Sequence, residues 1–236
     1  AGFVSKESAV EPEQILSGMG RAIAHRGPDD AGVWHHPGLG VGLVHRRLSI
    51  QDLSPAGAQP MASASGRYVI AFNGEVYNFR QLHSELVKLG CQFRGHSDTE
   101  VMLHAIEQWG LAPSLARFSG MFAFALIDLQ ERTLVLARDR MGEKPLYYGY
   151  QGTVLLFGSE LKALRAHPAW EGGVDQQALA LLLRHNVIPA PWSIHKGIFK
   201  LPPASMVTFQ LNAGHSNPLP EPERYWRLEE CFVERP

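Results

Sequence analysis

The chain has 236 residues, of which 45% are hydrophobic and 19% are charged. This length and composition allow one sizeable buried core, so a single globular domain is the default expectation. The 22 Lys and Arg residues nearly balance the 23 Asp and Glu residues, giving a formal net charge of -1. Because nucleic-acid and membrane-surface binders carry a basic face, this balance argues against both and leaves small polar substrates open.

The two cysteines, Cys91 and Cys231, lie far apart and lack the spacing of metal ligands. They argue against a zinc site and against a disulfide framework, and they fit a reducing compartment. No window reaches the roughly 18–20 apolar residues that a membrane helix needs, and residues 1–13 lack the apolar stretch of a signal peptide. We therefore expect a cytoplasmic protein that is neither exported nor anchored.

The first part of the chain predicts a helix, strands and two more helices. Ile15, Met19 and Ile23 recur at helical spacing, and the second strand contains Asn73-Gly74, a turn signal. Ser97 and Glu100 form a capping-box pattern at the start of the last helix. The predicted elements are a helix over about 12–25, strands at 41–50 and 67–77, and helices at 79–89 and 97–109.

The second part of the chain predicts a meander of short strands joined by polar connections of hairpin length. The strands fall at 121–128, 133–139, 145–150, 153–160 and 204–211. The run 174–187 is apolar enough for a buried helix, opened by Asp175. Residues 212–236 are rich in proline and charge, which indicates a linker or edge segment. Helices followed by many strands predict an α+β fold with antiparallel sheet.

Several sequence signals favour structural roles over functional ones. The run EGGVDQ at 171–176 lacks both serines of a pyrophosphate-binding loop and predicts a turn. His35-His36 has no second pair at metal spacing and predicts a solvated loop, so we expect no metal site. Tyr147, Tyr148 and Phe157 are expected to pack in the core or at a sheet edge.

Four motifs carry most of the remaining signal. They are HRGPDDAG at 25–32, HRRLSI at 45–50, FNGEVYN at 72–78 and GHSDTEV at 95–101. Alone, each has a structural explanation, such as a helix stop, a hairpin turn or a capping box. In register with them stand GMFAFALID at 120–128, ARDRMGEKPLYYG at 137–149, SELKAL at 159–164 and KGIFKLPPAS at 196–205. Together they resemble the glutamine-hydrolysing domain of asparagine synthetases, which are class II (N-terminal-nucleophile) amidotransferases.

The resemblance implies a four-layer αββα sandwich of two antiparallel sheets. It implies an amidotransferase domain over 1–211, with 212–236 leading to a C-terminal ATP-dependent synthetase domain that is absent from the chain. The implied partners are L-glutamine, that synthetase domain and, as is common in the family, a second copy in a homodimer. No cofactor is implied in this domain, whereas ATP and Mg²⁺ would belong to the synthetase domain.

Position 1 departs from the family pattern. In that family the mature first residue is a cysteine, and its thiolate attacks the side-chain amide of glutamine. The α-amino group of the same residue serves as the base, and the ordinary pKa of an α-amino group is about 7.7–8.0. Ala1 occupies this position and has no nucleophile. The resemblance therefore implies that the chain as written binds glutamine without hydrolysing it.

The resemblance also implies roles for six other residues. Asn73 and Gly74 match the oxyanion hole, and Arg47 matches the arginine that binds the substrate α-carboxylate. Ile50 matches a further substrate-binding position. Glu75 and Asp98 match the acidic partners of the substrate α-ammonium group.

Two explanations of Ala1 stay open. Alanine either replaces a natural cysteine, or the protein naturally lacks the cysteine, as β-lactam synthetases do. The first makes the chain the glutaminase half of an enzyme that amidates aspartate or another acceptor. The second makes it a binding or scaffold domain.

Overall fold

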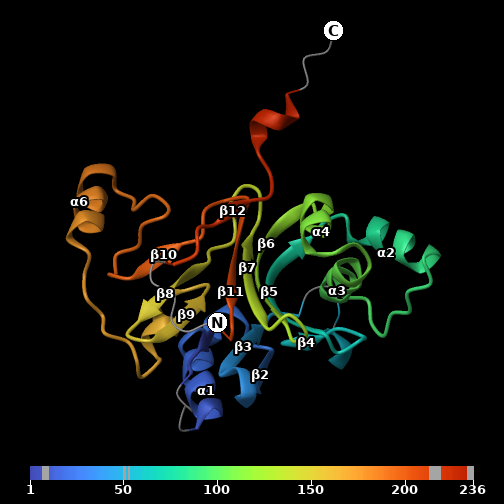
Figure 1. Ribbon diagram of the computed structural model, residues 1–236, viewed down its shortest axis with the longest axis horizontal. Coiled ribbons are helices and arrows are strands. Elements are labelled where there is room, and N and C mark those ends of the chain that lie inside the picture. The colour runs from blue at the N-terminus through green and yellow to red at the C-terminus, as the bar shows by residue number, and fades with distance from the viewer. Residues whose placement is uncertain (7–10, 50–51, 53, 213–218, 233–236) are drawn as a thin grey trace.

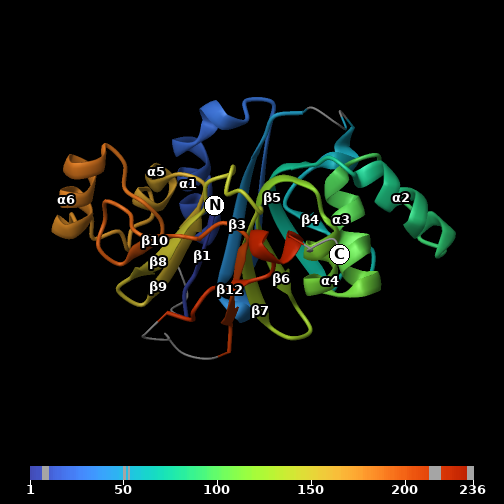
Figure 2. The same cartoon turned by 90° about the horizontal axis from the view of Figure 1, so that it is seen from above.

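The computed structural model describes residues 1–6, 11–49, 52, 54–212 and 219–232. Two six-stranded antiparallel sheets lie face to face in this part of the chain, with helices on their outer faces (Figure 1). Figure 2 shows the spatial order of the layers, from α1 and α5 through the two sheets to α2, α3 and α4. The predicted α+β class and the four-layer αββα sandwich are confirmed.

Sheet A has the strand order β10-β8-β9-β1-β3-β2. Its first strand in the sequence, β1, lies in the interior of the sheet between β9 and β3. Its strands are β1 (Gly2–Val4), β2 (Asp30–His36), β3 (Val41–Arg47), β8 (Tyr147–Gln151), β9 (Val154–Gly158) and β10 (Ile198–Lys200). The amino end of the chain is therefore built into the middle of the fold.

Sheet B has the strand order β12-β11-β7-β6-β5-β4. Its strands are β4 (Met61–Ala62), β5 (Tyr68–Val76), β6 (Gly120–Asp128), β7 (Thr133–Arg138), β11 (Ser205–Gln210) and β12 (Glu223–Arg224). The edge strand β12 belongs to the segment beyond residue 212, where the hydroxyl of Tyr225 also donates to the carbonyl of Arg138 at 2.8 Å.

The core has three apolar layers, as the sandwich requires. Between the sheets, side chains of alternating strand positions interdigitate, including Leu43 and Phe157 from sheet A and Ile127 and Leu136 from sheet B. The outer face of sheet B packs against α2, α3 and α4, and that of sheet A packs against α1 and α5. The helices are α1 (Pro12–Ala22), α2 (Phe79–Lys88), α3 (Asp98–Trp109), α4 (Leu111–Arg117), α5 (Leu161–Arg165) and α6 (Gln176–His185).

Short 3₁₀ turns complete the described secondary structure. They are η1 (Ala24–Arg26), η2 (Pro37–Leu39), η3 (Pro55–Gly57) and η4 (Leu228–Cys231). The first helix therefore ends as an α-helix at Ala22, three residues before its predicted end, and continues as the 3₁₀ turn η1. His25 and Arg26 belong to this turn, and both line a pocket described below.

The structure corrects the prediction that 174–187 forms a buried helix. The helix α6 does begin after Asp175, whose side chain accepts hydrogen bonds from the amides of Gln177 and Ala178. However, Ala178 is its one buried residue, and Leu183 is 77% exposed. In Figure 1, α6 stands apart from both sheets. The apolar residues of this run therefore favour a helix, but most of them are not buried.

The turn signal at Asn73-Gly74 produces no turn, because β5 runs straight through it, in agreement with the predicted strand at 67–77, and pairs Asn73 with Ala123 and Gly74 with Phe122. The prediction of a solvated loop at His35-His36 is wrong, because both residues belong to β2, which pairs with β3 over its whole length. In both places strand pairing decides the backbone conformation.

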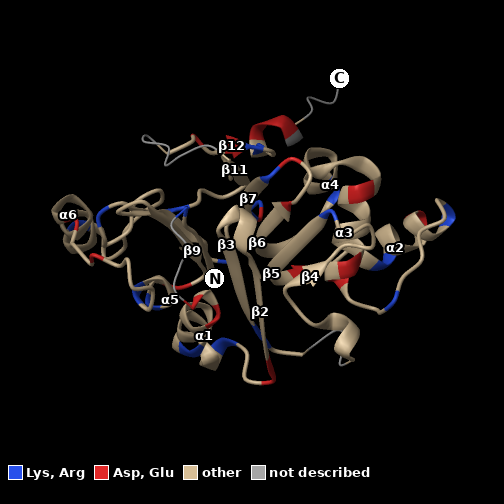
Figure 3. Ribbon diagram, turned by 60° about the horizontal axis from the view of Figure 1, so that its bottom comes forward, with Lys and Arg blue, Asp and Glu red and all other residues tan. Residues whose placement is uncertain are grey.

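Charged residues are dispersed over the fold. In the view of Figure 3, basic and acidic positions are scattered over helices and connections, while the sheet strands carry few of either. Among the described residues, no helix has the length and apolar character to span a membrane. The described part of the chain also contains no group of three or more His, Cys, Asp or Glu side chains placed to hold a metal ion.

Candidate functional site

Ala1 directly precedes β1 and extends the pairing of that strand with β3 by one residue. Its α-amino nitrogen donates to the carbonyl oxygen of Val44 at 2.9 Å, and the amide of Val44 donates back to the carbonyl of Ala1 at 2.8 Å. On the opposite side lies Gly158, at the end of β9. A Cβ added there would be 2.9 Å from the Ala1 Cβ, so glycine leaves room for the side chain at position 1.

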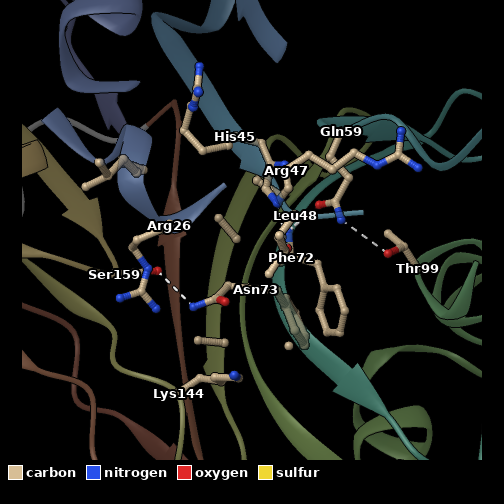
Figure 4. Close-up of a pocket in the computed structure, with 18 of the residues that line it drawn as sticks. Arg26, His45, Arg47, Leu48, Gln59, Phe72, Asn73, Thr99, Lys144 and Ser159 are labelled. Atoms are coloured by element: carbon tan, nitrogen blue, oxygen red, sulfur yellow. Dashed lines mark hydrogen bonds between the residues drawn. The ribbon is translucent and has the colours of Figure 1, made fainter. Parts of the chain in front are cut away.

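A pocket of about 450 Å³ opens beside Ala1. Its walls come from both sheets, from η1, from the segment after β3 and from the start of α3 (Figure 4). It gathers the described residues that the sequence singled out, namely Ala1, Arg47, Asn73, Gly74, Glu75 and Asp98. Ile50, the remaining candidate, lies outside the described residues.

Asn73 and Gly74 reach the pocket from β5. The side-chain Nδ2 of Asn73 donates to the hydroxyl of Ser159 at 3.2 Å, which links sheet B to sheet A (Figure 4). Gly74 is needed for a packing reason, since a Cβ there would lie 2.1 Å from the carbonyl oxygen of Met121 on β6. This close approach lets β5 pass through the pocket wall without a bulge.

Asp98 is a buried carboxylate at the first turn of α3 and is 5% exposed. Its Oδ2 accepts a hydrogen bond from the amide of Val76 at 3.0 Å. Burial raises the pKa of Asp98, and the negative charge of Glu75 raises it further. The hydrogen bond from Val76 lowers this pKa but does not outweigh burial. Two acidic groups thus face the pocket with no basic side chain bonded to Asp98 in the described structure.

Arg47, at the end of β3, also lines the pocket. Its Nη2 donates to the carbonyl oxygens of Asp52 and Ser54, at 3.1 Å in the second case. A Cβ at position 57 would lie 2.4 Å from this nitrogen, so a side chain there would clash with the guanidinium and glycine avoids the clash. The pocket lining therefore includes a guanidinium at Arg47 and carboxylates at Glu75 and Asp98, charges of both signs that suit a zwitterion.

The α-amino group of Ala1 titrates far from its ordinary range. Burial lowers its pKa from 8.0 to about 5, because a charged ammonium loses hydration inside the fold. A neutral amine at neutral pH is a proton acceptor. The structure therefore places a base directly at the residue whose side chain faces the pocket.

His45, next to this amino group, is also kept neutral. Burial and then the positive charge of the amino terminus lower its pKa to about 4. Its Nε2 is 3.0 Å from the carbonyl oxygen of Phe72, so the neutral ring donates from Nε2. Its Nδ1 is buried and has no hydrogen-bond partner in the described structure.

Sequence reasoning assigned no role to several other pocket residues. Arg26 donates to the carboxylate of Glu160 at 2.8 Å, and His25 and Lys162 each bond the same carboxylate at 3.0 Å. Burial raises the pKa of Glu160, but these three hydrogen bonds outweigh it and lower the pKa to about 2. Ser159 and Glu160 are the first two residues of the SELKAL motif at 159–164. This motif is the sequence signal that points to them.

Gln59 is a second unpredicted part of the pocket wall. Its Oε1 accepts from the amide of Phe72 at 2.7 Å, and its Nε2 donates to the hydroxyl of Thr99 at 3.3 Å (Figure 4). It therefore ties β5 to α3 just behind Asn73 and Asp98. No motif contains Gln59, so only the tertiary structure reveals it.

The sandwich, with residue 1 on an inner strand beside a two-sheet pocket, defines an N-terminal-nucleophile type of amidotransferase fold. The family model described as the glutamine amidotransferase domain matches residues 1–226. The chain is 38% identical over 229 residues to asparagine synthetase (glutamine-hydrolyzing) 3 of Bacillus subtilis, covering 95% of this chain and 35% of that protein. It is 34% identical over 200 residues to asparagine synthetase (glutamine-hydrolyzing) 1 of the same organism, covering 85% of this chain and 31% of that protein.

Among solved structures, the glutamine phosphoribosylpyrophosphate amidotransferase of Bacillus subtilis superposes with a TM-score of 0.69 and 20% identity. The match covers 95% of this chain and 48% of that one, and it supports the fold. The chain belongs to the glutamine amidotransferase domain family, and the two relatives above are glutamine-hydrolyzing asparagine synthetases. It spans about a third of the length of the two curated relatives.

Proposed function

We propose that the pocket binds L-glutamine and that, with cysteine at position 1, the domain hydrolyses it to glutamate and ammonia. The ammonia would serve the ATP-dependent amidation of aspartate or a related carboxylate by a synthetase domain that holds ATP and Mg²⁺. The observation that carries the proposal is one pocket joining Ala1, Asn73, Gly74, Arg47, Glu75 and Asp98.

The charges of the pocket support a free α-amino acid as the ligand. Arg47 offers paired donors to an α-carboxylate, and Glu75 and Asp98 complement an α-ammonium group. Ionised Asp98 is buried without a basic partner and its pKa is raised, so a ligand cation would relieve an existing cost. An uncharged amide would make neither interaction, and an ammonium ion would lack the carboxylate that Arg47 binds.

The reacting groups support acyl transfer at position 1. The neutral α-amino group would take the thiol proton, and the thiolate would attack the side-chain carbonyl carbon of glutamine. Asn73 Nδ2 and the Gly74 amide would stabilise the oxyanion while the proton passes to the departing nitrogen, releasing ammonia. Water would then hydrolyse the thioester, giving glutamate and the free thiol.

Ala1 has a methyl group where this chemistry needs a thiol, so the chain as written would bind glutamine without turnover. Calorimetric titration of the chain tests the binding step, with D-glutamine and ammonium chloride as controls. We expect heat with L-glutamine only. Ala1→Cys protein with residue 1 as its free amino terminus tests the reaction, and we expect glutamate release. The unsubstituted chain, which retains Cys91 and Cys231, is the matched control for other thiols.

A second candidate is a scaffold domain that naturally lacks the nucleophile. The observation that favours it is that Arg47 already donates to the carbonyls of Asp52 and Ser54. The side chain proposed to bind the substrate α-carboxylate therefore already has partners within the chain. Under this alternative, a folded chain gives a silent titration with L-glutamine, and Ala1→Cys protein releases no glutamate.

A further inference from the structure

Two hydrogen bonds join the sheets across the pocket, and they bracket residue 1. The strands that flank β1 in sheet A are β3 and β9. From β3, His45 Nε2 lies 3.0 Å from the carbonyl oxygen of Phe72. Directly after β9, the hydroxyl of Ser159 accepts from Nδ2 of Asn73 at 3.2 Å. Consecutive residues of β5 are therefore held from both sides of position 1.

The anchor points are themselves tied to the first residue. His45 follows Val44, whose backbone exchanges two hydrogen bonds with Ala1. Ser159 follows Gly158, which lies against the Ala1 side chain. A short covalent path and two backbone hydrogen bonds therefore fix both links relative to residue 1, so the distance from position 1 to Asn73 is determined by a few rigid contacts.

The link to Ser159 also fixes the plane of the Asn73 amide. A side-chain NH₂ group has two hydrogens in one plane with its carbonyl oxygen. When Ser159 accepts one of them, rotation of the amide is restrained and the second hydrogen keeps a set direction. Donors to a developing oxyanion work best when they are oriented before the reaction, because no ordering is then needed in the transition state.

We propose that Ser159 is a positioning residue that orients the side-chain amide of Asn73, with His45 holding the same strand from the other side of residue 1. The inference rests on the proposed glutaminase function and extends it. Ser159 acts only through Asn73 and leaves the binding of the α-carboxylate and α-ammonium groups to Arg47, Glu75 and Asp98. Its loss therefore affects kcat and spares KM.

The test compares Ser159→Ala and Ser159→Thr in the Ala1→Cys background. We expect Ser159→Ala to lower kcat by about tenfold to a hundredfold, less than the about 10²–10³ that follows removal of a whole oxyanion donor, with KM within about twofold. Ser159→Thr retains the hydroxyl and should keep most of the activity. Ser114→Ala is the matched control, since it removes a hydroxyl on α4 that donates to the carbonyl of Gly110, outside the pocket.

The outcomes separate this inference from the proposed function. If the Ala1→Cys parent releases no glutamate, the proposed function fails and the catalytic role of Ser159 fails with it. If the parent is active and Ser159→Ala keeps its kcat, or loses activity through KM, the positioning role alone is overturned. Equal losses in Ser114→Ala would also overturn it, because they would indicate a general effect of removing a buried hydroxyl.

A readout independent of turnover accompanies the kinetics. In the Ala1 chain, the two side-chain amide protons of Asn73 should exchange with solvent at different rates, because one is bonded to Ser159. Ser159→Ala should accelerate exchange of the slower proton, as measured by NMR. Equal exchange rates in both proteins would contradict the restraint.

Discussion

The α-amino nitrogen of Ala1 lies 2.9 Å from the carbonyl oxygen of Val44, as part of a two-way backbone pairing between these residues. This pairing aligns the first residue with sheet A, inside the fold. Burial at this position then lowers the pKa of its amino group.

The lowered pKa of this amino group predicts the acid limit of activity. In Ala1→Cys protein, the base is neutral above about pH 5, because burial lowers its pKa from 8.0 to about 5. We expect kcat/KM for glutamine hydrolysis to fall as pH decreases through about 5. A limb centred near pH 8 would contradict the prediction. A variant with one extra residue before position 1 is the control and should be inactive.

Replacing Gly158 should disturb position 1 directly. In Gly158→Ala, the new methyl would lie 2.9 Å from the Ala1 Cβ and 3.1 Å from Leu164 Cδ1. We expect a loss of about 1–3 kcal/mol in the free energy of unfolding, measured by urea denaturation, since overpacking forces neighbours to shift.

The matched control for this change is Gly18→Ala on α1. A Cβ at Gly18 meets only Arg21 Nη2 at 3.9 Å, so there is space for it. We expect a gain of about 0.5–1 kcal/mol, because alanine favours helix over glycine. A Gly158 variant as stable as its parent would show that the β9 contact is softer than the structure indicates.

Asp98 should make glutamine binding dependent on pH. Its pKa is raised, mainly by burial, so the carboxylate becomes protonated at a higher pH than usual and then loses its attraction for an ammonium group. We expect affinity in the Ala1 chain to decrease as pH falls through that raised pKa, as measured by calorimetry. Asp98→Asn should weaken binding at least about tenfold at pH 7 and remove this pH dependence.

The control for Asp98 is Glu107→Gln, which changes a carboxylate on the same helix that bonds Ser65 outside the pocket. Its glutamine affinity should match that of the parent. An Asp98→Asn protein that binds as tightly as the parent would contradict the assigned role.

Glu160 should stabilise the fold above the acidic range. Its folded pKa of about 2 is below the ordinary 4.5, so its contribution is present above pH 4.5 and is lost as pH falls toward 2. We expect Glu160→Gln to lose about 2 kcal/mol at pH 7, reduced from the full pKa difference because the carboxylate is partly solvated. The loss should disappear near pH 2, as followed by urea denaturation.

Glu131→Gln provides the comparison, because this carboxylate is 62% exposed and lies 3.9 Å from Arg67. Its stability should stay within about 0.5 kcal/mol of the parent at every pH. A constant deficit of Glu160→Gln at all pH values would indicate lost packing instead of lost charge.

Residues 73 and 74 show where local sequence reasoning stops. Asn-Gly is a hairpin signal, but here it lies inside β5, because the pairing with β6 extends over the whole strand and leaves no space for a Cβ at Gly74. The sequence supplied the residue types of an oxyanion site by resemblance, and pairing partners about 50 positions away decided their backbone geometry.

By itself, the sequence determined the family, the class of fold and most helices and strands, because motifs, caps and periodicity act over short distances. The α3 start shows this, since the side chain of Ser97 accepts from the amide of Glu100 as the local pattern predicts. The tertiary structure decided how residues of β1, β3, β5, β9 and α3 meet in one pocket. It also decided the pKa of the amino terminus and the links from Ser159 and His45, because burial and cross-sheet contacts join residues that no local pattern relates.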